Sequence, residues 1–261
     1  WRNIPAAIWR GRSGTLRPVS RPDPVRLDDL LGIDTQKAKI LQNTERFLRG
    51  EPCNHVLLWG SRGTGKSSIV KALLNEYSPR GLRVIEVDKD DLQDLPDIVD
   101  DIRERSQRFI VYCDDLSFED GEHQYKHLKS VLEGSLELPP ENVRLYATSN
   151  RRHLVPEYMK DNEQSQVVGR EIHHGDVVEE KISLSDCFGL ALSFYPISEP
   201  QYFEIVDHLF GPVKDRDQLH VRARRFSMEK GVRSGRTARQ FYNQFVGEFP
   251  KCYLLYGFSL N

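Results

Sequence analysis

The stretch Gly60-Ser-Arg-Gly-Thr-Gly-Lys-Ser67 matches the phosphate-binding pattern G-x-x-x-x-G-K-[ST] at every required position. The apolar run 56–59 before it predicts a short buried strand. Residues 67–75 after it predict a helix, because apolar residues recur there at helical spacing. In such a strand–loop–helix unit, backbone N–H groups and a helix N-terminus point at one oxyanion. The stretch therefore predicts a site for a nucleoside triphosphate.

The residues of this loop have separate expected tasks. The glycines let the backbone turn back on itself, Lys66 reaches the β- and γ-phosphates, and the Ser67 hydroxyl ligates Mg²⁺. The helix before the loop, which residues 27–33 lead into, is expected to pack where an adenine ring needs apolar cover. The predicted nucleotide contacts are Gly60, Ser61, Arg62, Gly63, Thr64, Gly65, Lys66, Ser67 and Ser68, with Leu31 and Gly32 from that preceding segment.

The composition fits a soluble globular protein. The chain has 261 residues, of which 38% are hydrophobic and 29% charged, so its length suggests about one or two domains. No apolar run is long enough for a membrane span, and no signal peptide is found. The net charge of −2 gives no overall case for nucleic-acid binding. Four scattered cysteines without metal spacing suit a reducing compartment, so we expect a cytoplasmic protein.

Three segments differ in their patterns. Residues 1–24 carry five arginines and a single acid, Asp23, which predicts an extended basic arm. This arm is either a solvated tail or a contact for a neighbouring subunit, nucleic acid or lipid. Residues 25–196 alternate strand and helix patterns and form the predicted nucleotide-binding domain. Residues 197–261 contain helical patterns and a tail, which predicts a small helical lid domain.

Apolar runs that alternate with helices predict a three-layer α/β fold, with a parallel sheet covered on both faces. The further strands are predicted at 84–87, 109–113, 143–149 and 190–195, and the helices at 34–49, 96–105 and 122–132. The helix at 34–49 is expected to turn Leu41, Thr44 and Leu48 to one side. Residues 159–181 are polar and predict a long surface loop or an insertion.

The lid is expected to contain three helices. The first ends near Phe210, the second ends near Glu229 and the third begins near Ser234. Ser198 and Gln201 form a plausible capping box for the first of them. Phe241, Phe245 and Phe249 recur four residues apart in the last, and this spacing is typical of a core stripe.

Polar residues follow two of the predicted strands. Asp114 comes directly after strand 109–113, and the ends of parallel strands lie beside the phosphate loop, so its carboxylate is expected to hold Mg²⁺ opposite Ser67. Asp115 is then the base or the group that orients water. Asn150 ends the next strand, where its amide could bond both the γ-phosphate and the attacking water. The alternative for the acidic pair is a polar strand end with turn chemistry.

This order of motifs resembles that of the AAA+ ATPases over residues 27–249. Gly60–Ser67, Asp114-Asp115, Asn150 and Ser234-Gly-Arg236-Thr-Ala-Arg239 are similar to Walker A, Walker B, sensor 1 and sensor 2. More narrowly, three stretches resemble a bacterial AAA+ family described as a domain of unknown function: Phe109-Ile-Val-Tyr-Cys-Asp-Asp-Leu-Ser-Phe-Glu119, Ala147-Thr-Ser-Asn-Arg-Arg-His153 and Ser185-Asp-Cys-Phe-Gly-Leu190.

The resemblance implies a five-stranded sheet in the order 5-1-4-3-2. It implies assembly into a ring or filament of identical subunits, with nucleotide at the subunit interfaces. It also implies that Arg236 reaches the γ-phosphate from the lid; the alternative is a surface arginine on a basic helix.

Two positions depart from the resembled pattern. Many relatives carry Glu where this chain has Asp115, which is one methylene shorter. Cys187 stands where replication-initiator-type relatives carry an arginine finger, which can contribute roughly 10³ to 10⁵ in rate. Either another arginine substitutes, or hydrolysis is slow. The candidates for the substitute are Arg151, Arg152 and Arg170.

Two histidine groups could be mistaken for metal sites. His123 and His127 have i, i+4 spacing, but no clear third ligand lies nearby in the sequence, so a solvated helix face is the better interpretation. His173, His174 and Asp176 lie in the polar segment and are likewise not expected to bind metal.

The sequence thus predicts a Mg²⁺-dependent ATPase with Lys66, Asp115, Asn150 and Arg236 as catalytic residues, binding ATP or ADP. It would couple nucleotide state to the assembly or remodelling of a macromolecular target, either protein or nucleic acid. One alternative is a regulatory binding module with little turnover. Another is a DNA loader or remodeller that uses the arm and residues 214–239, where nine basic residues stand against three acids.

Overall fold

The computed structural model describes residues 1–117, 128–129, 131–132, 139–151, 154 and 184–251. The chain forms two compact units. The first, here called the core unit, comprises Trp1–Leu27, Asp34–Gly60 and Lys66–Phe194. The second, the lid unit, comprises Asp28–Ile33, Ser61–Gly65 and Tyr195–Asn261. The middle of the phosphate loop therefore groups with the lid helices.

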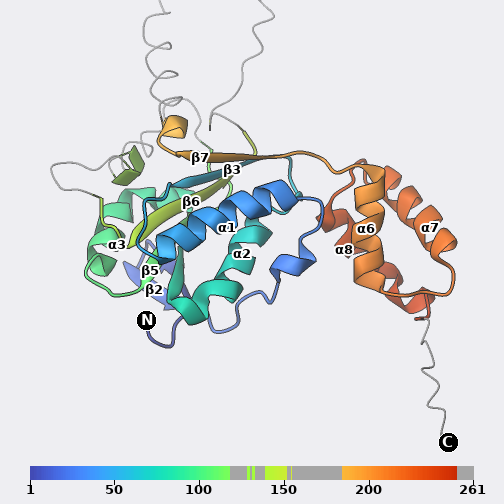
Figure 1. Cartoon of the computed structure of the whole chain (residues 1–261), viewed down its shortest axis with the longest axis horizontal. Helices are drawn as coiled ribbons and strands as arrows, with labels where there is room; N and C mark the ends of the chain where they lie inside the picture. The colour runs from blue at the N-terminus through green and yellow to red at the C-terminus, as the bar shows by residue number, and fades with distance from the viewer. Residues whose placement is uncertain (118–127, 130, 133–138, 152–153, 155–183, 252–261) are drawn as a thin grey trace, which may run out of the picture. The chain divides into compact units, whose positions relative to one another are not determined.

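The core unit is built on a seven-stranded sheet in the order β2-β1-β4-β5-β6-β3-β7 (Figure 1). All neighbouring strands are parallel except β1 and β2. The predicted order 5-1-4-3-2 corresponds to β7-β3-β6-β5-β4 and is confirmed, with β1 and β2 added beyond β4. The strands are β1 Ala6–Arg10, β2 Thr15–Pro18, β3 Val56–Gly60, β4 Leu82–Glu86, β5 Arg108–Cys113, β6 Val143–Ser149 and β7 Leu190–Phe194.

Helices cover both faces of this sheet. α3 (Leu95–Ile102) packs on one face, where Leu95 and Ile98 join the buried cluster that contains Leu57 and Val111 of the strands. α1 (Asp34–Leu48) and α2 (Lys66–Tyr77) lie on the other face (Figure 1). Short 3₁₀ turns occupy Leu27–Asp29, Ser78–Arg80 and Lys89–Asp94. The three-layer α/β fold is therefore confirmed.

The buried side of α1 differs from the predicted one. Ile40, Asn43, Thr44 and Phe47 are buried, whereas Leu41 and Leu48, which were expected beside Thr44, are only half-buried. The difference arises because Asn43 is held by hydrogen bonds and can be buried despite its polarity. The predicted helix 122–132 lies largely outside the described residues, and residues 159–181 lie outside them entirely.

The N-terminal segment was predicted to be an extended basic arm, and this prediction was wrong. β1 and β2 form an antiparallel hairpin, and β1 pairs in parallel with β4. Ala6, Ala7 and Trp9 of β1 are buried, and the Trp9 indole N–H donates to Asp94 at 2.8 Å. The count of arginines concealed this short apolar run, because the arginines occupy the exposed positions around it.

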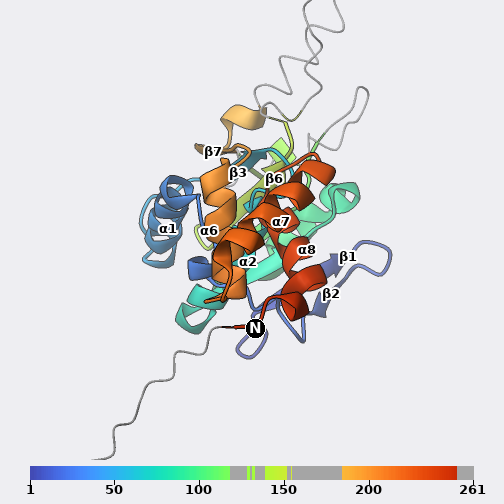
Figure 2. The same cartoon turned by 90° about the vertical axis from the view of Figure 1, so that its right-hand side faces the viewer.

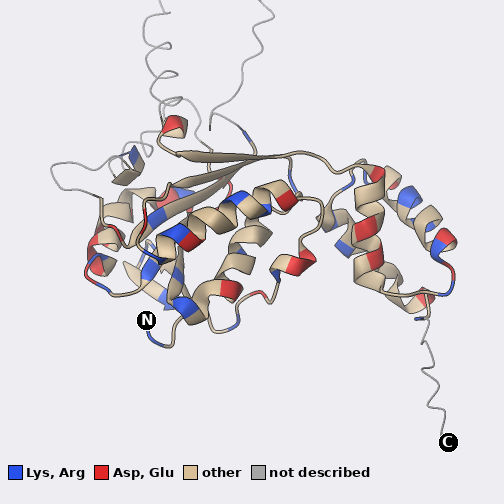
Figure 3. Ribbon diagram, in the orientation of Figure 1, with Lys and Arg blue, Asp and Glu red and all other residues tan. Residues whose placement is uncertain are grey.

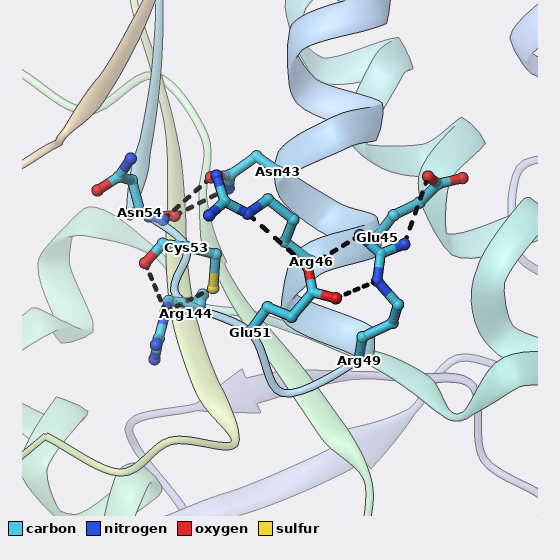
Figure 4. Close-up of polar contacts among 8 residues, drawn as sticks. All are labelled: Asn43, Glu45, Arg46, Arg49, Glu51, Cys53, Asn54 and Arg144. Carbon is cyan, nitrogen blue, oxygen red and sulfur yellow. Dashed lines mark hydrogen bonds and ion pairs between the residues drawn. The ribbon is translucent and has the colours of Figure 1, made fainter.

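The connection from α1 to β3 fixes the strand that leads into the phosphate loop (Figure 4). Asn43 Nδ2 donates to the Asn54 carbonyl and Asn54 N–H donates to Asn43 Oδ1, each at 3.0 Å. Nearby, Arg49 bonds Glu51 at 2.7 Å, and Arg144 Nε donates to Cys53 Sγ at 3.2 Å. The two Asn43–Asn54 bonds tie α1 to the chain just before β3 by satisfying backbone groups that would otherwise need water.

The lid unit contains α6 (Glu199–Phe210), α7 (Arg216–Glu229) and α8 (Gly235–Phe245), which pack against one another (Figure 2). A 3₁₀ turn at Val246–Glu248 follows. The predicted capping box of Ser198 and Gln201 is confirmed. Phe241 and Phe249 are buried and Phe245 packs against their cluster, as expected of a core stripe. Phe249 lies beyond the end of α8, however, and not within the last helix as predicted.

Charge is distributed unevenly among these helices. Acidic residues mark α6, whereas Lys and Arg mark α7 and α8 (Figure 3). Glu199 of α6 pairs with Arg224 at 2.6 Å and with Arg233 at 3.2 Å. Part of the basic excess in residues 214–239 is therefore balanced inside the lid unit. Among the described residues, no helix is long and apolar enough to cross a bilayer.

His55, just before β3, is held in its neutral form. Its Nδ1 accepts the Leu145 N–H at 2.9 Å. Burial, followed by the charge of Arg144, lowers the pKa of His55 from 6.5 to about 4. The unfolded chain therefore binds a proton more readily than the folded chain between these two values.

The first prediction concerns the hairpin. Trp9→Ala should lower the free energy of unfolding by about 3–5 kcal/mol, because it removes a large buried side chain and leaves a cavity. Ser13→Ala at the exposed tip is the control and should cost under about 0.5 kcal/mol. Chemical denaturation measures both. Equal stability of the two variants would show that the hairpin is not part of the core.

The second prediction concerns pH. The stabilisation from neutral His55 is complete above pH 6.5 and is lost as the pH falls toward 4, which amounts to roughly 3 kcal/mol. His55→Asn keeps an acceptor for Leu145 but cannot titrate. Denaturation at several pH values should show that the free energy of unfolding of the parent falls by this amount more than that of His55→Asn between pH 6.5 and 4. Identical pH profiles of the two proteins would contradict the assignment of a neutral His55.

Candidate functional site

In the core unit, the predicted phosphate-binding lysine lies folded over the start of the loop. Lys66 begins α2 and is buried, with 7% of its surface exposed. Its Nζ donates to the Gly60 carbonyl at 2.7 Å and to Asn150 Oδ1 at 3.4 Å. The lysine and the predicted sensor amide, 84 positions apart in the sequence, therefore meet at one end of the sheet.

The predicted metal ligands are in direct contact. Ser67 Oγ donates to Asp114 Oδ1 at 2.8 Å, and the Thr148 hydroxyl donates to the same oxygen. Burial raises the pKa of Asp114, but hydrogen bonds from neighbouring hydroxyls, that of Thr148 foremost, more than offset it, so the pKa lies below its usual value. Asp114 is therefore an anion at neutral pH, with a hydroxyl oxygen beside it.

Asp115 occupies an unusual backbone conformation next to this pair. Its φ is 52°, in the left-handed region that Asp and Asn tolerate better than other side chains. Its N–H donates to Thr148 Oγ1 at 2.9 Å, and Asn150 Nδ2 donates to its carboxylate. The two residues predicted to orient water thus contact each other.

The first glycine of the loop is required by close packing. Gly60 has a φ of 127°, and a Cβ at this position would overlap the Phe194 carbonyl oxygen at the end of β7. β3 and β7 pair from Val56 to Gly60, so the strand delivers the chain into the loop directly against its neighbour. Any larger residue would displace the strand end.

In the lid unit, the remaining loop residues lie against the start of α8. Thr64 Oγ1 donates to the Ser61 carbonyl at 2.8 Å and closes the loop. Gly63 has a φ of 77°, and a Cβ there would lie 2.9 Å from Ser234 Oγ and 3.3 Å from the Cβ of Arg236. Arg236 is therefore beside the loop, in the first turn of a helix capped by Ser234.

The segment that contains the predicted nucleotide contacts Leu31 and Gly32 also lies in the lid unit. Gly32 has a φ of 74° and faces the Gln201 side chain, where a Cβ would lie 3.5 Å from Nε2. A Cβ on Gly65 would lie 3.6 Å from Cδ1 of Ile33. Leu31 is half-buried. The lid unit thus brings together loop residues, the segment 31–33 and Arg236; that these residues contact a nucleotide stays a prediction.

Other predicted residues have less definite positions. Ser68 lies half-buried in the first turn of α2, and Arg62 is exposed on the loop. Cys187 is half-buried and packs against the core cluster. The Nη1 atom of Arg151 is buried and makes no hydrogen bond to described residues. Arg152, Arg170, His123, His127, His173, His174 and Asp176 lie outside the described residues.

The residues present fit magnesium and a triphosphate. A serine hydroxyl and an ionised carboxylate are hard oxygen donors, which Mg²⁺ prefers. Within the described part of the chain, no group of three His, Cys, Asp or Glu side chains offers a competing metal site. A buried lysine beside a glycine-containing loop suits phosphate oxygens.

Two residues near Asp114 were not predicted from the sequence. Thr148 bonds both acidic residues, and the Tyr112 hydroxyl is buried beside them. The signal was available in the strand alternation, since Tyr112 precedes Asp114, and Thr148 precedes Asn150, by two positions in each case. Side chains two apart on a strand share a face of the sheet.

Residues 2–249 match the protein family described as "Protein of unknown function (DUF815)". The chain is 36% identical over 76 residues to the replication factor C large subunit of Staphylothermus marinus, covering 29% of this chain and 17% of that protein. It is 37% identical over 79 residues to the 26S proteasome regulatory subunit 6B homolog of Schizosaccharomyces pombe, covering 27% and 20%. The matched parts span a fifth or less of these relatives.

Solved structures of RuvB from Thermotoga maritima have a similar fold. One mutant form aligns with a TM-score of 0.51 at 14% identity, covering 85% of this chain and 73% of RuvB. A second mutant form gives a TM-score of 0.50 at 15% identity, covering 85% and 72%. The fold and the motif order agree with the resemblance drawn from the sequence. The chain belongs to the DUF815 family, and it has the fold of the AAA+ ATPases.

Proposed function

We propose that this protein is a Mg²⁺-dependent ATPase that couples its nucleotide state to the assembly or remodelling of a macromolecular target. The observation that carries the proposal is the contact of Ser67 with Asp114 at 2.8 Å beside the Lys66–Asn150 pair. These four residues lie at the start of α2 and directly after β5 and β6, and they have the chemistry that phosphoryl transfer needs. The relation to AAA+ ATPases supports the general activity.

Each residue has a distinct part in the proposed reaction. Lys66 exchanges its bond to the Gly60 carbonyl for bonds to phosphate oxygens. Ser67 and Asp114 would hold Mg²⁺, which when bound supplies positive charge to the phosphate oxygens. Asp115 and Asn150, already bonded to each other, orient the attacking water, with the Asp115 carboxylate as acceptor of its proton.

We expect nucleotide binding to be coupled to the lid because the middle of the phosphate loop belongs to the lid unit. Ser61–Gly65 cluster with α8 and Arg236 in the lid unit, while Lys66 and Ser67 belong to the core unit. A triphosphate held by this loop would contact Ser61–Gly65, which belong to the lid unit. Binding and loss of the γ-phosphate would then shift the conformational equilibrium of the lid residues, with Arg236 as the γ-phosphate contact.

Association of identical subunits is part of the proposal. Two of the relatives are named as subunits of larger assemblies. The target, protein or nucleic acid, would be handled by such an assembly.

A regulatory binding module is the second candidate function. Cys187 occupies the position of the resembled arginine finger and packs half-buried against the core cluster. A thiol cannot neutralise charge that develops on phosphate oxygens. In this version, ATP or ADP binding sets the assembly state and turnover is slow. Phosphate release measured across protein concentrations that favour assembly separates the two candidates.

The third prediction tests the phosphate site. Lys66→Ala should weaken ATP binding roughly 10- to 100-fold, since a charge-assisted hydrogen bond contributes about 1.5–3 kcal/mol. Lys71→Ala on the same helix removes an exposed lysine that pairs with Asp23 and should bind ATP as the parent does. Calorimetric titration measures both. Unchanged binding by Lys66→Ala would place the nucleotide elsewhere.

The fourth prediction tests the role of Asp115. Asp115→Asn should bind ATP normally and lose turnover by roughly 10²- to 10⁴-fold, as expected for a lost general base. Asn tolerates the φ of 52° and keeps the oxygen that accepts from Asn150, so the fold is retained. Phosphate release and nucleotide titration are measured on the same preparation. Turnover equal to that of the parent would exclude Asp115 as the base.

A further inference from the structure

Thr148 connects the two acidic residues through its single hydroxyl. It is nearly fully buried, with 2% of its surface exposed, and lies near the end of β6. Its Oγ1 accepts the Asp115 N–H at 2.9 Å, so that backbone group is the donor. A hydroxyl has one proton to give, and here it is given to Asp114 Oδ1. The direction of both hydrogen bonds is thereby fixed.

The backbone of Thr148 holds the other side of the same turn. Its carbonyl accepts the Leu116 N–H at 2.7 Å. Thr148 therefore accepts hydrogen bonds from the N–H groups on both sides of the Asp115 Cα. Its hydroxyl accepts from Asp115, and its backbone carbonyl accepts from Leu116. A non-glycine residue with a φ of 52° persists only where the surroundings hold it. Thr148 supplies that support.

Tyr112 places a second hydroxyl at the same carboxylate. The pairing of Tyr112 with Tyr146 between β5 and β6 makes 112, 114, 146 and 148 share one face of the sheet. Tyr112 is 4% exposed, and its hydroxyl is buried and makes no hydrogen bond of good geometry to any described residue. Burial raises the pKa of Tyr112, and the charge of Asp114 raises it further.

A buried hydroxyl without a partner is unfavourable, and most such groups in folded proteins find a donor or an acceptor. Asp114 and Thr148 share the sheet face of Tyr112, and Ser67 donates to Asp114. In the proposed function Ser67 would hold Mg²⁺ instead of donating to Asp114, and Asp114 Oδ1 would lose the hydrogen bond from Ser67 Oγ. The Tyr112 hydroxyl is then in place to donate to the Asp114 carboxylate or to a water beside it.

We propose that Thr148 and Tyr112 are positioning residues for the metal-binding carboxylate Asp114, and that together they set the affinity for Mg²⁺ in the nucleotide complex. This inference rests on the function proposed above. Residues that orient a ligating carboxylate commonly alter metal affinity 10- to 100-fold when they are replaced. The competing explanation is that both hydroxyls serve the stability of the strand ends alone.

The experiment measures the Mg²⁺ concentration that half-saturates binding of a non-hydrolysable ATP analogue, together with the thermal stability of the ligand-free protein. Thr148→Val keeps the shape and removes the hydroxyl, and Thr148→Ser keeps the hydroxyl. Tyr112→Phe removes only the phenolic oxygen. Matched controls are Thr44→Val and Tyr146→Phe, which break the buried hydroxyl pair of α1 and β6, 2.8 Å apart.

Thr148→Val should raise the half-saturating Mg²⁺ concentration about tenfold, and Thr148→Ser should restore it to within about threefold of the parent. Tyr112→Phe should raise it about fivefold, with ligand-free stability equal to or above that of the parent, because the lost hydroxyl had no partner. Thr44→Val and Tyr146→Phe should lower the melting temperature without changing the Mg²⁺ dependence.

The inference is overturned if Thr148→Val and Tyr112→Phe both require the same Mg²⁺ concentration as the parent, or if the controls shift it equally. If Thr148→Val fails to fold, the Mg²⁺ dependence of Tyr112→Phe alone decides the test. A parent protein that binds no ATP analogue at any Mg²⁺ concentration would instead overturn the proposed function, and this inference with it.

Discussion

The hydrogen bond between Ser67 and Asp114 depends on the parallel pairing of the central strands. β3 and β5 both pair with β6, so their carboxyl ends come to the same edge of the sheet. The loop after β3 delivers Ser67 there, and the end of β5 delivers Asp114. A slip of one residue in either pairing would turn Asp114 or Thr148 to the opposite face of the sheet, where α3 packs. The register of three strands is therefore the constraint on which the site depends.

Charge at this edge is kept stable by local hydrogen bonds. Asp114 carries its negative charge in a partly buried position because hydroxyl groups donate to it. Lys66 is buried, yet it bonds a carbonyl and an amide oxygen. The Lys66 ammonium and the Asp114 carboxylate therefore suit a ligand that accepts hydrogen bonds from the lysine and binds the same metal cation as the carboxylate. A triphosphate with Mg²⁺ has this chemistry.

Much of this could be predicted from the sequence, because the signals were local. The loop pattern, the apolar strands and the polar residues after them indicated a parallel sheet and pointed to Lys66, Ser67 and Asp114 as site residues. The resemblance to the AAA+ ATPases supplied the strand order. The N-terminal hairpin was missed because the prediction relied on the high arginine content of residues 1–24 and gave too little weight to the short apolar run around Trp9. The alternation along β6 places Thr148 on the same face as Asn150, but it does not reveal the contacts of Thr148 with Asp114 and Asp115 across the strands, so Thr148 was missed.

The units also divide the chain in a way that the sequence did not suggest. The loop was treated as one element of the nucleotide-binding domain, yet Ser61–Gly65 cluster with the lid helices. The reason is the close approach of Gly63 to Ser234 and Arg236, which only a residue without a side chain allows. The same feature that shapes the phosphate loop thus ties its middle to the lid.

The most direct test of the central claim is a crystal structure of the protein with a non-hydrolysable ATP analogue and Mn²⁺ in place of Mg²⁺. The account predicts an anomalous peak for the metal beside Ser67 Oγ and the Asp114 carboxylate, with the phosphates along residues 60–67. Phosphates bound away from this loop, or a metal that contacts neither Ser67 nor Asp114, would contradict it.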